Sequence, residues 1–132
     1  MLVVDASVAV LWTLDQQGSD RAAALSGESG LIAPSLIVVE IGNALWKAVR
    51  RGDLPPEHAV TAAEIALGPL HEMKSAEELR ARALELAIEL DHPIYDCFYL
   101  ALAERERCAL VTADQRLLAR AKRAKGIEVR KL

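Results

Sequence analysis

Short apolar runs recur along the chain between longer stretches in which apolar and polar residues are mixed. Each run is three to six residues long and is bounded by glycine, proline or a charged residue, which is typical of strands buried in a sheet. The runs that predict strands are LVV at 2–4, LIAP at 31–34 and ALVT at 109–112, and the more polar segments LHEMK at 70–74 and IEVRKL at 127–132 are interpreted as strands as well.

The longer stretches carry apolar residues at helical spacing and begin or end at residues that favour helix termini. Ser7 is a candidate cap for the first helix, and Ser75 with Glu78 has the pattern of a capping box. Gly52 is placed to end the longest helix. The predicted helices cover VAVLWTL at 8–14, RAAAL at 21–25, LIVVEIGNALWKAVRR at 36–51, LPPEHAVTAAEIAL at 54–67, ELRARALELAIEL at 78–90, IYDCFYLALAERER at 94–107 and QRLLARAKRAK at 115–125.

Strands and helices therefore alternate from one end of the chain to the other. This order predicts an α/β fold with a mainly parallel central sheet that is covered by helices on both faces. A length of 132 residues suits one domain, so we expect residues 1–132 to form a single unit. No repeat, linker or low-complexity segment interrupts it.

Composition adds little to this picture, but the distribution of charge does. The net charge is −3, and 9 of the 16 basic residues lie within residues 103–132. The basic segment from Arg116 to Lys125 is a candidate for contacts with nucleic acid, and a solvated helix face is the alternative.

We expect a cytoplasmic protein. The opening MLVVDAS lacks the basic segment of a secretory signal, and no apolar stretch is long enough to cross a bilayer. Cys97 and Cys108 lie in apolar surroundings without a CxxC pattern, so we expect them to be free thiols and not a disulfide.

Four acidic residues are the strongest chemical signal. Asp5 and Asp114 each follow a predicted strand, at the sheet edge where parallel α/β proteins bind ligands. Glu40 and Asp96 are lone acids within apolar helical stretches, where an unpaired charge is costly. Each has an alternative explanation: Asp5 and Asp114 as helix caps, Glu40 as a partner of a basic residue such as Lys47, and Asp96 as an acid that favours its helix dipole.

Four carboxylates in one pocket repel one another, at a cost of roughly 3 kcal/mol for each pair about 5 Å apart. Protonation or a bound cation must offset this cost, and hard oxygen ligands favour Mg²⁺ or Mn²⁺. His58, His71 and His92 show no zinc-binding spacing, and we interpret His92 as a helix-start residue. Carboxylate-held Mg²⁺ is typical of enzymes that cut phosphodiester bonds.

The segments VVDASVAV, PSLIVVEIGNALWKAV, YDCFYLALAE and LVTAD, in this order and spacing, resemble those of the PIN-domain ribonucleases. Within that family the chain is similar to VapC-type toxins of toxin–antitoxin pairs. The resemblance covers essentially the whole chain. It implies a Rossmann-like α/β/α sandwich that cuts RNA with Mg²⁺ or Mn²⁺.

The resemblance also implies roles for individual residues. The metal-binding acids of the family match Asp5, Glu40, Asp96 and Asp114 of this chain, and the supporting polar positions match Ser7, Asn43 and Thr112. Some relatives carry a further acid shortly after the TAD aspartate, whereas residues 115–118 here are QRLL, so the number of metal ions is left open.

The family further implies a homodimer and a small antitoxin protein as partner. In the toxin–antitoxin complex, only the antitoxin is expected to bind operator DNA. Helices near Trp12 and Trp46 are candidate surfaces for that partner. No membrane association is expected.

Three other functions fit the sequence less well. A receiver-like signalling domain needs paired acids after the first strand and a lysine after a later one, and neither is present. A haloacid-dehalogenase-like phosphatase needs DxD, but Ser7 occupies the third position. A catalytically silent PIN-like module that only binds RNA or protein is disfavoured by the complete set of acids.

Overall fold

The computed structural model describes all residues from 1 to 132, and its elements alternate as the sequence predicts. The strands are β1 (Leu2–Val4), β2 (Leu31–Pro34), β3 (Glu72–Lys74), β4 (Leu110–Thr112) and β5 (Val129–Lys131). The α-helices are α1 (Ala6–Ala9), α2 (Ser19–Ser26), α3 (Ile37–Arg51), α4 (Ala59–Leu67), α5 (Ala76–Leu90), α6 (Ile94–Glu106) and α7 (Gln115–Ala121). Short 3₁₀ helices follow α1 at Val10–Trp12 and precede α4 at Pro56–His58.

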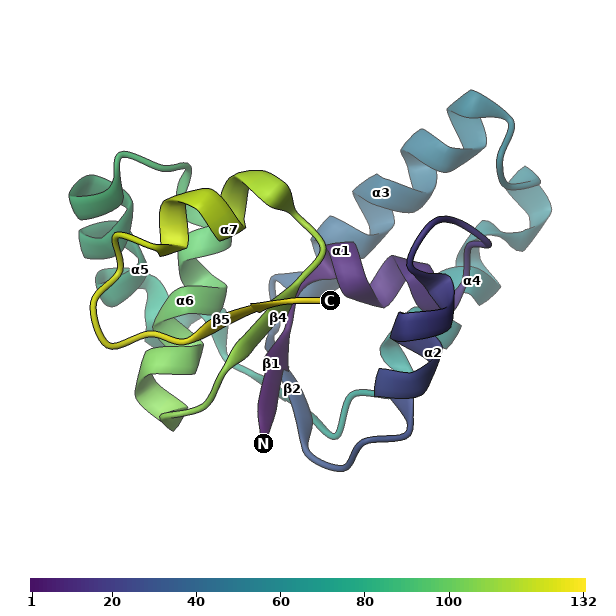
Figure 1. The fold of residues 1–132 in the computed structure, drawn as a ribbon. Coiled ribbons are helices and arrows are strands. Elements are labelled where there is room, and N and C mark those ends of the chain that lie inside the picture. The colour runs from purple at the N-terminus through teal and green to yellow at the C-terminus, as the bar shows by residue number, and fades with distance from the viewer.

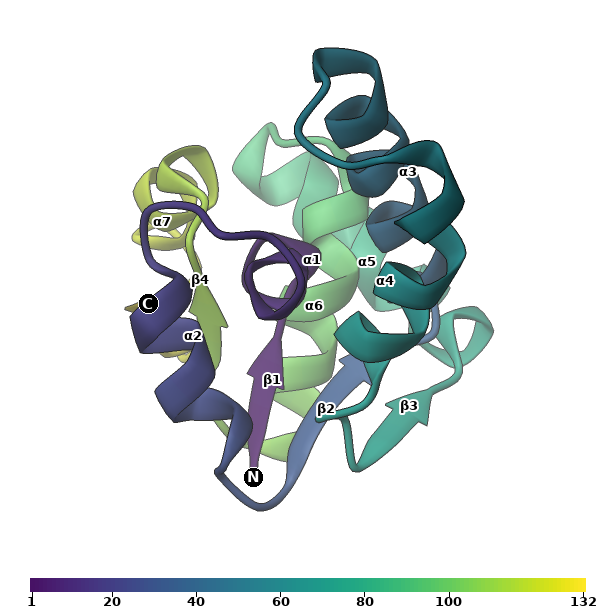
Figure 2. The ribbon, with the colours of Figure 1, turned by 90° about the vertical axis from the view of Figure 1, so that its right-hand side faces the viewer.

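The strands form one sheet in the order β3-β2-β1-β4-β5, and every neighbouring pair is parallel. The predicted α/β class and parallel sheet are thus confirmed. The chain moves outward from β1 through β2 to β3 on one side, and then crosses to β4 and β5 on the other (Figure 2). The carboxyl ends of β1 and β4 flank this change of direction, which is where open α/β sheets bind ligands.

Both faces of the three central strands are apolar, which explains why β1, β2 and β4 read as continuous apolar runs, whereas the edge strands β3 and β5 are more polar and largely exposed. Val3, Ile32 and Leu110 belong to a large core cluster that includes residues of α3, α5 and α6. Their neighbours along the strands face the opposite way and form a second cluster with α1. The members of this second cluster are Val4, Val8, Leu31 and Val111.

The helices divide into two groups on either side of α1 (Figure 1). Helices α3 and α4 pack on each other and extend away from the sheet on one side, whereas α5, α6 and α7 lie on the other. Helix α5 packs along α6, which in turn contacts β1, β2 and β4. The space at the carboxyl edge of the sheet is therefore flanked by α3 on one side and by the beginnings of α6 and α7 on the other.

Three local predictions need correction. The first helix is capped by Asp5, which accepts a hydrogen bond from the Val8 N–H, and not by Ser7. The Ser75 side chain makes no cap hydrogen bond; the Ala76 N–H is bound instead by the Ser35 hydroxyl. Helix α7 ends at Ala121, before the end of the predicted helix. The first helix is thus capped by the other local candidate, Asp5, whereas a residue distant in the chain, Ser35, binds the first N–H group of α5.

Two further observations concern the chain as a whole. Cys97 and Cys108 are free, as predicted. None of the helices combines the length and the apolarity that a membrane crossing requires.

Candidate active site

A cavity of about 790 Å³ opens at the carboxyl edge of the sheet, between α3 and the beginnings of α1, α6 and α7. All four acids predicted from the sequence line it: Asp5, Glu40, Asp96 and Asp114. They come from four separate segments, so only the fold brings them together. Asn43 and Ser7 line the same cavity.

Asp5 is the most deeply buried of the four, with only 4 % of its surface exposed. Burial raises the pKa of Asp5 from 3.8 to about 6, and the nearby charge of Asp96 adds to this increase. Hydrogen bonds from Ser7, Thr112 and the Val8 N–H act in the opposite direction, because they stabilise the ionised carboxylate. Asp5 is therefore a carboxylate whose charge is only partly compensated by the protein.

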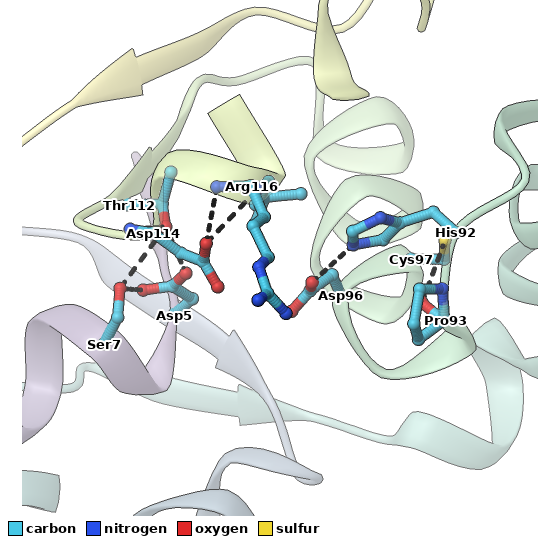
Figure 3. A network of polar contacts seen from close by, with 10 residues as sticks. Asp5, Ser7, His92, Pro93, Asp96, Cys97, Thr112, Asp114 and Arg116 are labelled. Atoms are coloured by element: carbon cyan, nitrogen blue, oxygen red, sulfur yellow. Dashed lines mark hydrogen bonds and ion pairs between the residues drawn. The ribbon is translucent and has the colours of Figure 1, made fainter. Parts of the chain in front are cut away.

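Two hydroxyl groups hold the Asp5 carboxylate from both sides (Figure 3). Ser7 Oγ donates to Asp5 Oδ1 at 2.5 Å, and Thr112 Oγ1 donates to Asp5 Oδ2. The same hydroxyl oxygens accept backbone N–H groups of the loop after β4: Ala113 donates to Ser7 at 2.9 Å, and Asp114 donates to Thr112 at 3.0 Å. The supporting hydroxyls thus tie the end of β1 to the loop that carries Asp114.

Asp114 has a structural role as well as a place in the cavity. Its Oδ1 accepts from the N–H groups of Arg116 and Leu117, so it is the N-cap of α7. The alternative interpretation of Asp114 as a helix cap is therefore correct, but it does not compete with a role in the site. Its Oδ2 makes no hydrogen bond within the protein and is free for a ligand.

One oxygen of Glu40 and the hydroxyl of Tyr99 are buried polar groups that make no hydrogen bond. Glu40 Oε1 and the Tyr99 hydroxyl are both inaccessible to solvent and lack partners of acceptable geometry, although they lie close enough to influence each other's charge. Burial, with a further contribution from Asp96, raises the pKa of Glu40. Burial also raises the pKa of Tyr99, so its hydroxyl stays protonated. The alternative explanation of Glu40 as a partner of Lys47 is wrong, since the two form no ion pair, although Lys47 lines the cavity.

Asp96 lies in the first turn of α6, where the helix dipole favours an acid, as its alternative interpretation has it. Its Oδ2 is 2.6 Å from His92 Nε2 (Figure 3). The interpretation of His92 as only a helix-start residue is therefore incomplete. The signal that was available is the separation of four residues, which lets a side chain just before a helix reach the first turn of that helix.

Two basic side chains, those of Lys47 and Arg116, line the cavity beside the acids. Arg116 lies in the first turn of α7 and extends toward Asp96 in Figure 3. It also lines a second hollow of about 450 Å³, together with Arg120 and with Asp96 and Asp114 of the first cavity. The two hollows therefore meet at these shared residues, and the acidic centre is continuous with a basic surface on α7.

The donor set suits a hard divalent cation. No group of three or more His, Cys, Asp or Glu side chains closes on a common point in this structure. However, the cavity offers carboxylate oxygens from four residues, a buried Glu40 oxygen without a partner, and an Asp5 whose burial penalises uncompensated charge. Such oxygens are the ligands that Mg²⁺ and Mn²⁺ prefer.

Comparison with known proteins gives consistent results. The family model of the PIN domain matches residues 2–124. Ribonuclease VapC3 of Pyrobaculum aerophilum is 34 % identical over 119 residues, which cover 88 % of this chain and 91 % of that protein. Exonuclease VapC9 of the same organism is 32 % identical over 93 residues, or 70 % of this chain and 68 % of the relative.

Solved structures with the same fold span the whole chain. PAE2754 from Pyrobaculum aerophilum superposes with a TM-score of 0.70 at 26 % identity, covering 97 % of this chain and 87 % of the other. The structure of VapBC2 from Rickettsia felis, bound to a DNA fragment from their promoter, has a TM-score of 0.69 at 16 % identity, with 99 % and 98 % covered. VapC20 of Mycobacterium tuberculosis, a toxin that cleaves the sarcin-ricin loop, has a TM-score of 0.69 at 21 % identity, with 98 % and 99 % covered.

Proposed function

This chain belongs to the PIN-domain family, among its VapC-type ribonucleases, and from that premise we propose that it is a Mg²⁺- or Mn²⁺-dependent endoribonuclease. The observation that carries the proposal is the meeting of four acids from separate segments in one cavity at the carboxyl edge of the sheet. In this proposal Asp5, Glu40, Asp96 and Asp114 hold the cation.

A divalent ion held by these carboxylates would lower the pKa of a water molecule for attack on a phosphodiester and offset the charge that grows on the phosphate oxygens. The protein's own groups prepare the site for it. Ser7 and Thr112 fix the Asp5 carboxylate, and Asp114 is fixed by capping α7. Asn43 lines the cavity one helical turn from Glu40, where its amide would bind a water or a substrate oxygen.

The substrate strand would follow the joined hollows. The acids of the first cavity alone would repel a phosphate backbone, but Lys47 lines one side of the cavity and Arg116 the other. Arg120 continues the basic surface into the second hollow. We infer that these side chains bind the phosphates that flank the cleaved bond, since basic groups supply most of the affinity for nucleic acid.

A toxin role in a VapBC-type pair is the second part of the proposal. The similarity to VapC3, and a fold shared with VapBC2, which was crystallised on promoter DNA, support a protein antitoxin as partner. Contact with operator DNA would then come through the antitoxin. Trp46 on α3 is 52 % exposed and suits such a partner, whereas Trp12 donates to the Ala22 carbonyl at 2.7 Å and belongs to the fold. A homodimer remains a prediction, to be checked by light scattering.

The nuclease proposal is tested with a purified circular single-stranded RNA, which only an endonuclease can open. Wild-type protein with Mg²⁺ or Mn²⁺ should linearise it, EDTA should stop the reaction, and Asp96→Asn should reduce the rate by about 10²- to 10³-fold, as loss of a group that stabilises the transition state does. Glu57→Gln, an exposed acid away from the cavity, is the control and should cut normally.

Each other result has a clear meaning. Cleavage that is indifferent to EDTA would refute the metal role. Cutting of linear RNA from one end, with the circle left intact, would make the protein an exonuclease, as the name of VapC9 indicates for that relative. Binding of RNA without cutting under any metal condition would favour the silent binding module.

A further inference from the structure

His92 and Asp96 form the closest contact between an acid of the cavity and a side chain outside the predicted set. His92 Nε2 lies 2.6 Å from Asp96 Oδ2. The His92 side chain is only 8 % exposed and that of Asp96 is 24 % exposed, so water competes weakly for this hydrogen bond. An ionised carboxylate can only accept, which places the proton on Nε2.

The backbone on both sides of His92 is fixed by the joint between α5 and α6. Asp91 ends α5 in the left-handed conformation, at φ 49°, and the His92 N–H donates to the Ala87 carbonyl at 3.1 Å. Pro93, the N-cap of α6, restricts the residue before it to extended conformations. The imidazole therefore approaches Asp96 from a rigid support and not from a flexible loop.

The contact uses only one oxygen of the carboxylate. Asp96 Oδ1 has no hydrogen-bond partner within the protein, and Asp96 lines the cavity shared with Asp5 and Glu40. A carboxylate without this support rotates about its side-chain torsions and loses conformational entropy when it binds an ion. A carboxylate held at Oδ2 has already given up that freedom, and Oδ1 remains for the ligand.

We infer that His92 is a positioning residue of the cation site: its Nε2–H holds Asp96 Oδ2 so that Oδ1 is available to a divalent ion. The inference rests on the proposed function, because it assumes that Asp96 is a metal ligand. Outer partners that orient metal ligands typically change metal affinity by about 10- to 100-fold when they are removed.

The rival explanation is that the pair only stabilises the joint between the two helices. Both explanations predict a loss of stability when the hydrogen bond is removed, so stability cannot separate them. Metal affinity separates the two explanations, and so does the choice of the residue that replaces His92. Glutamine places an amide N–H near the position of the histidine Nε2, whereas the shorter asparagine does not reach it.

The experiment measures Mn²⁺ binding by calorimetry to the full chain and to His92→Phe, His92→Gln and His92→Asn. His58→Phe is the matched control, since His58 is exposed and its side chain caps nothing. We expect His92→Phe and His92→Asn to weaken Mn²⁺ binding by about 10-fold or more, with His92→Gln and His58→Phe close to wild type. In cleavage assays His92→Phe should need more Mn²⁺ but approach the wild-type rate at saturation.

Equal Mn²⁺ affinity in wild type, His92→Phe and His92→Asn would overturn the inference and leave the nuclease proposal standing. If His92→Phe does not fold, the comparison of His92→Gln with His92→Asn decides, and equal affinity of these two refutes the inference. If the wild type binds no Mn²⁺, and if Asp96→Asn and wild type cleave RNA at the same rate, the metal proposal itself fails.

Discussion

At the scale of single residues, Asp5 shows how a residue proposed to bind the cation carries a folding cost. A carboxylate with 4 % exposure is destabilised by desolvation, and its hydrogen bonds from Ser7 and Thr112 recover only part of the loss. The charge of Asp96 repels the Asp5 carboxylate and raises the pKa of Asp5 further. The sequence identifies Asp5 as a candidate because it follows a strand, but the burial that raises its pKa exists only in the folded chain.

Asp5→Asn should therefore make the ion-free protein more stable at neutral pH. The pKa of Asp5 is about 6 in the folded protein and near 3.8 when unfolded, so the folded state binds the proton more tightly. Stability contributed by this group is complete below pH 4 and is lost as the pH rises to 6. The asparagine variant avoids that loss, which amounts to about 3 kcal/mol for a shift of this size.

Denaturant unfolding in EDTA at pH 4 and pH 7 measures this effect. The variant should exceed wild type by about 2–3 kcal/mol at pH 7, with a much smaller difference at pH 4, while Glu57→Gln tracks wild type at both. A variant that is less stable than wild type at pH 7 would show that the hydrogen bonds to the carboxylate outweigh its desolvation.

At the scale of elements, α7 links the acidic centre to a basic surface. Its N-cap, Asp114, lines the cavity, and Arg116 and Arg120, one turn apart, line the hollows beside it. The sequence predicts the cap, the basic helix and the strand before it, because each depends on residues close together in the chain. The helix ends at Ala121, four residues before the predicted end.

Arg116→Gln and Arg120→Gln should weaken RNA binding, because each substitution removes a cation that would bind a phosphate. For a single strand, removal of one phosphate-binding cation reduces the slope of log affinity against log salt by about 0.7. Binding is measured by fluorescence anisotropy on the Asp96→Asn background, which prevents cleavage, between low and physiological salt. Arg80→Gln, an exposed arginine of α5, is the control and should keep the slope of its parent. An unchanged slope in both test variants would place the RNA elsewhere.

At the scale of the whole molecule, the order of the strands creates the site. Because β1 lies between β2 and β4, the residues that follow β1 and β4 meet although more than a hundred positions separate them. Helices α3 and α6 complete the cavity from opposite sides. The fold thus gathers mutually repelling groups in one place, which is stable only because the large apolar core outweighs the repulsion.

Expression of the wild type alone should arrest growth of a bacterial host if the protein is the toxin of a pair. Asp96→Asn, expressed to the same level, should be harmless, and co-expression of a small protein from the neighbouring reading frame should restore growth with the wild type. Growth curves with matched protein levels on immunoblots provide the measurement. Normal growth with a wild type that cuts RNA in vitro would leave the nuclease in place and remove the toxin role.

The sequence by itself determined the order and type of the elements, the parallel α/β class and which four acids line the cavity. These features depend on local periodicity and on motifs of a few residues. The family motifs also pointed to Ser7 and Thr112 as supporting residues. Only the tertiary structure decided that both hydroxyls bind the Asp5 carboxylate, that Glu40 Oε1 and the Tyr99 hydroxyl are buried without partners, and that His92 Nε2 lies 2.6 Å from Asp96 Oδ2. The reason is that burial and hydrogen-bond partners are set by the packing of distant segments, which no local pattern records.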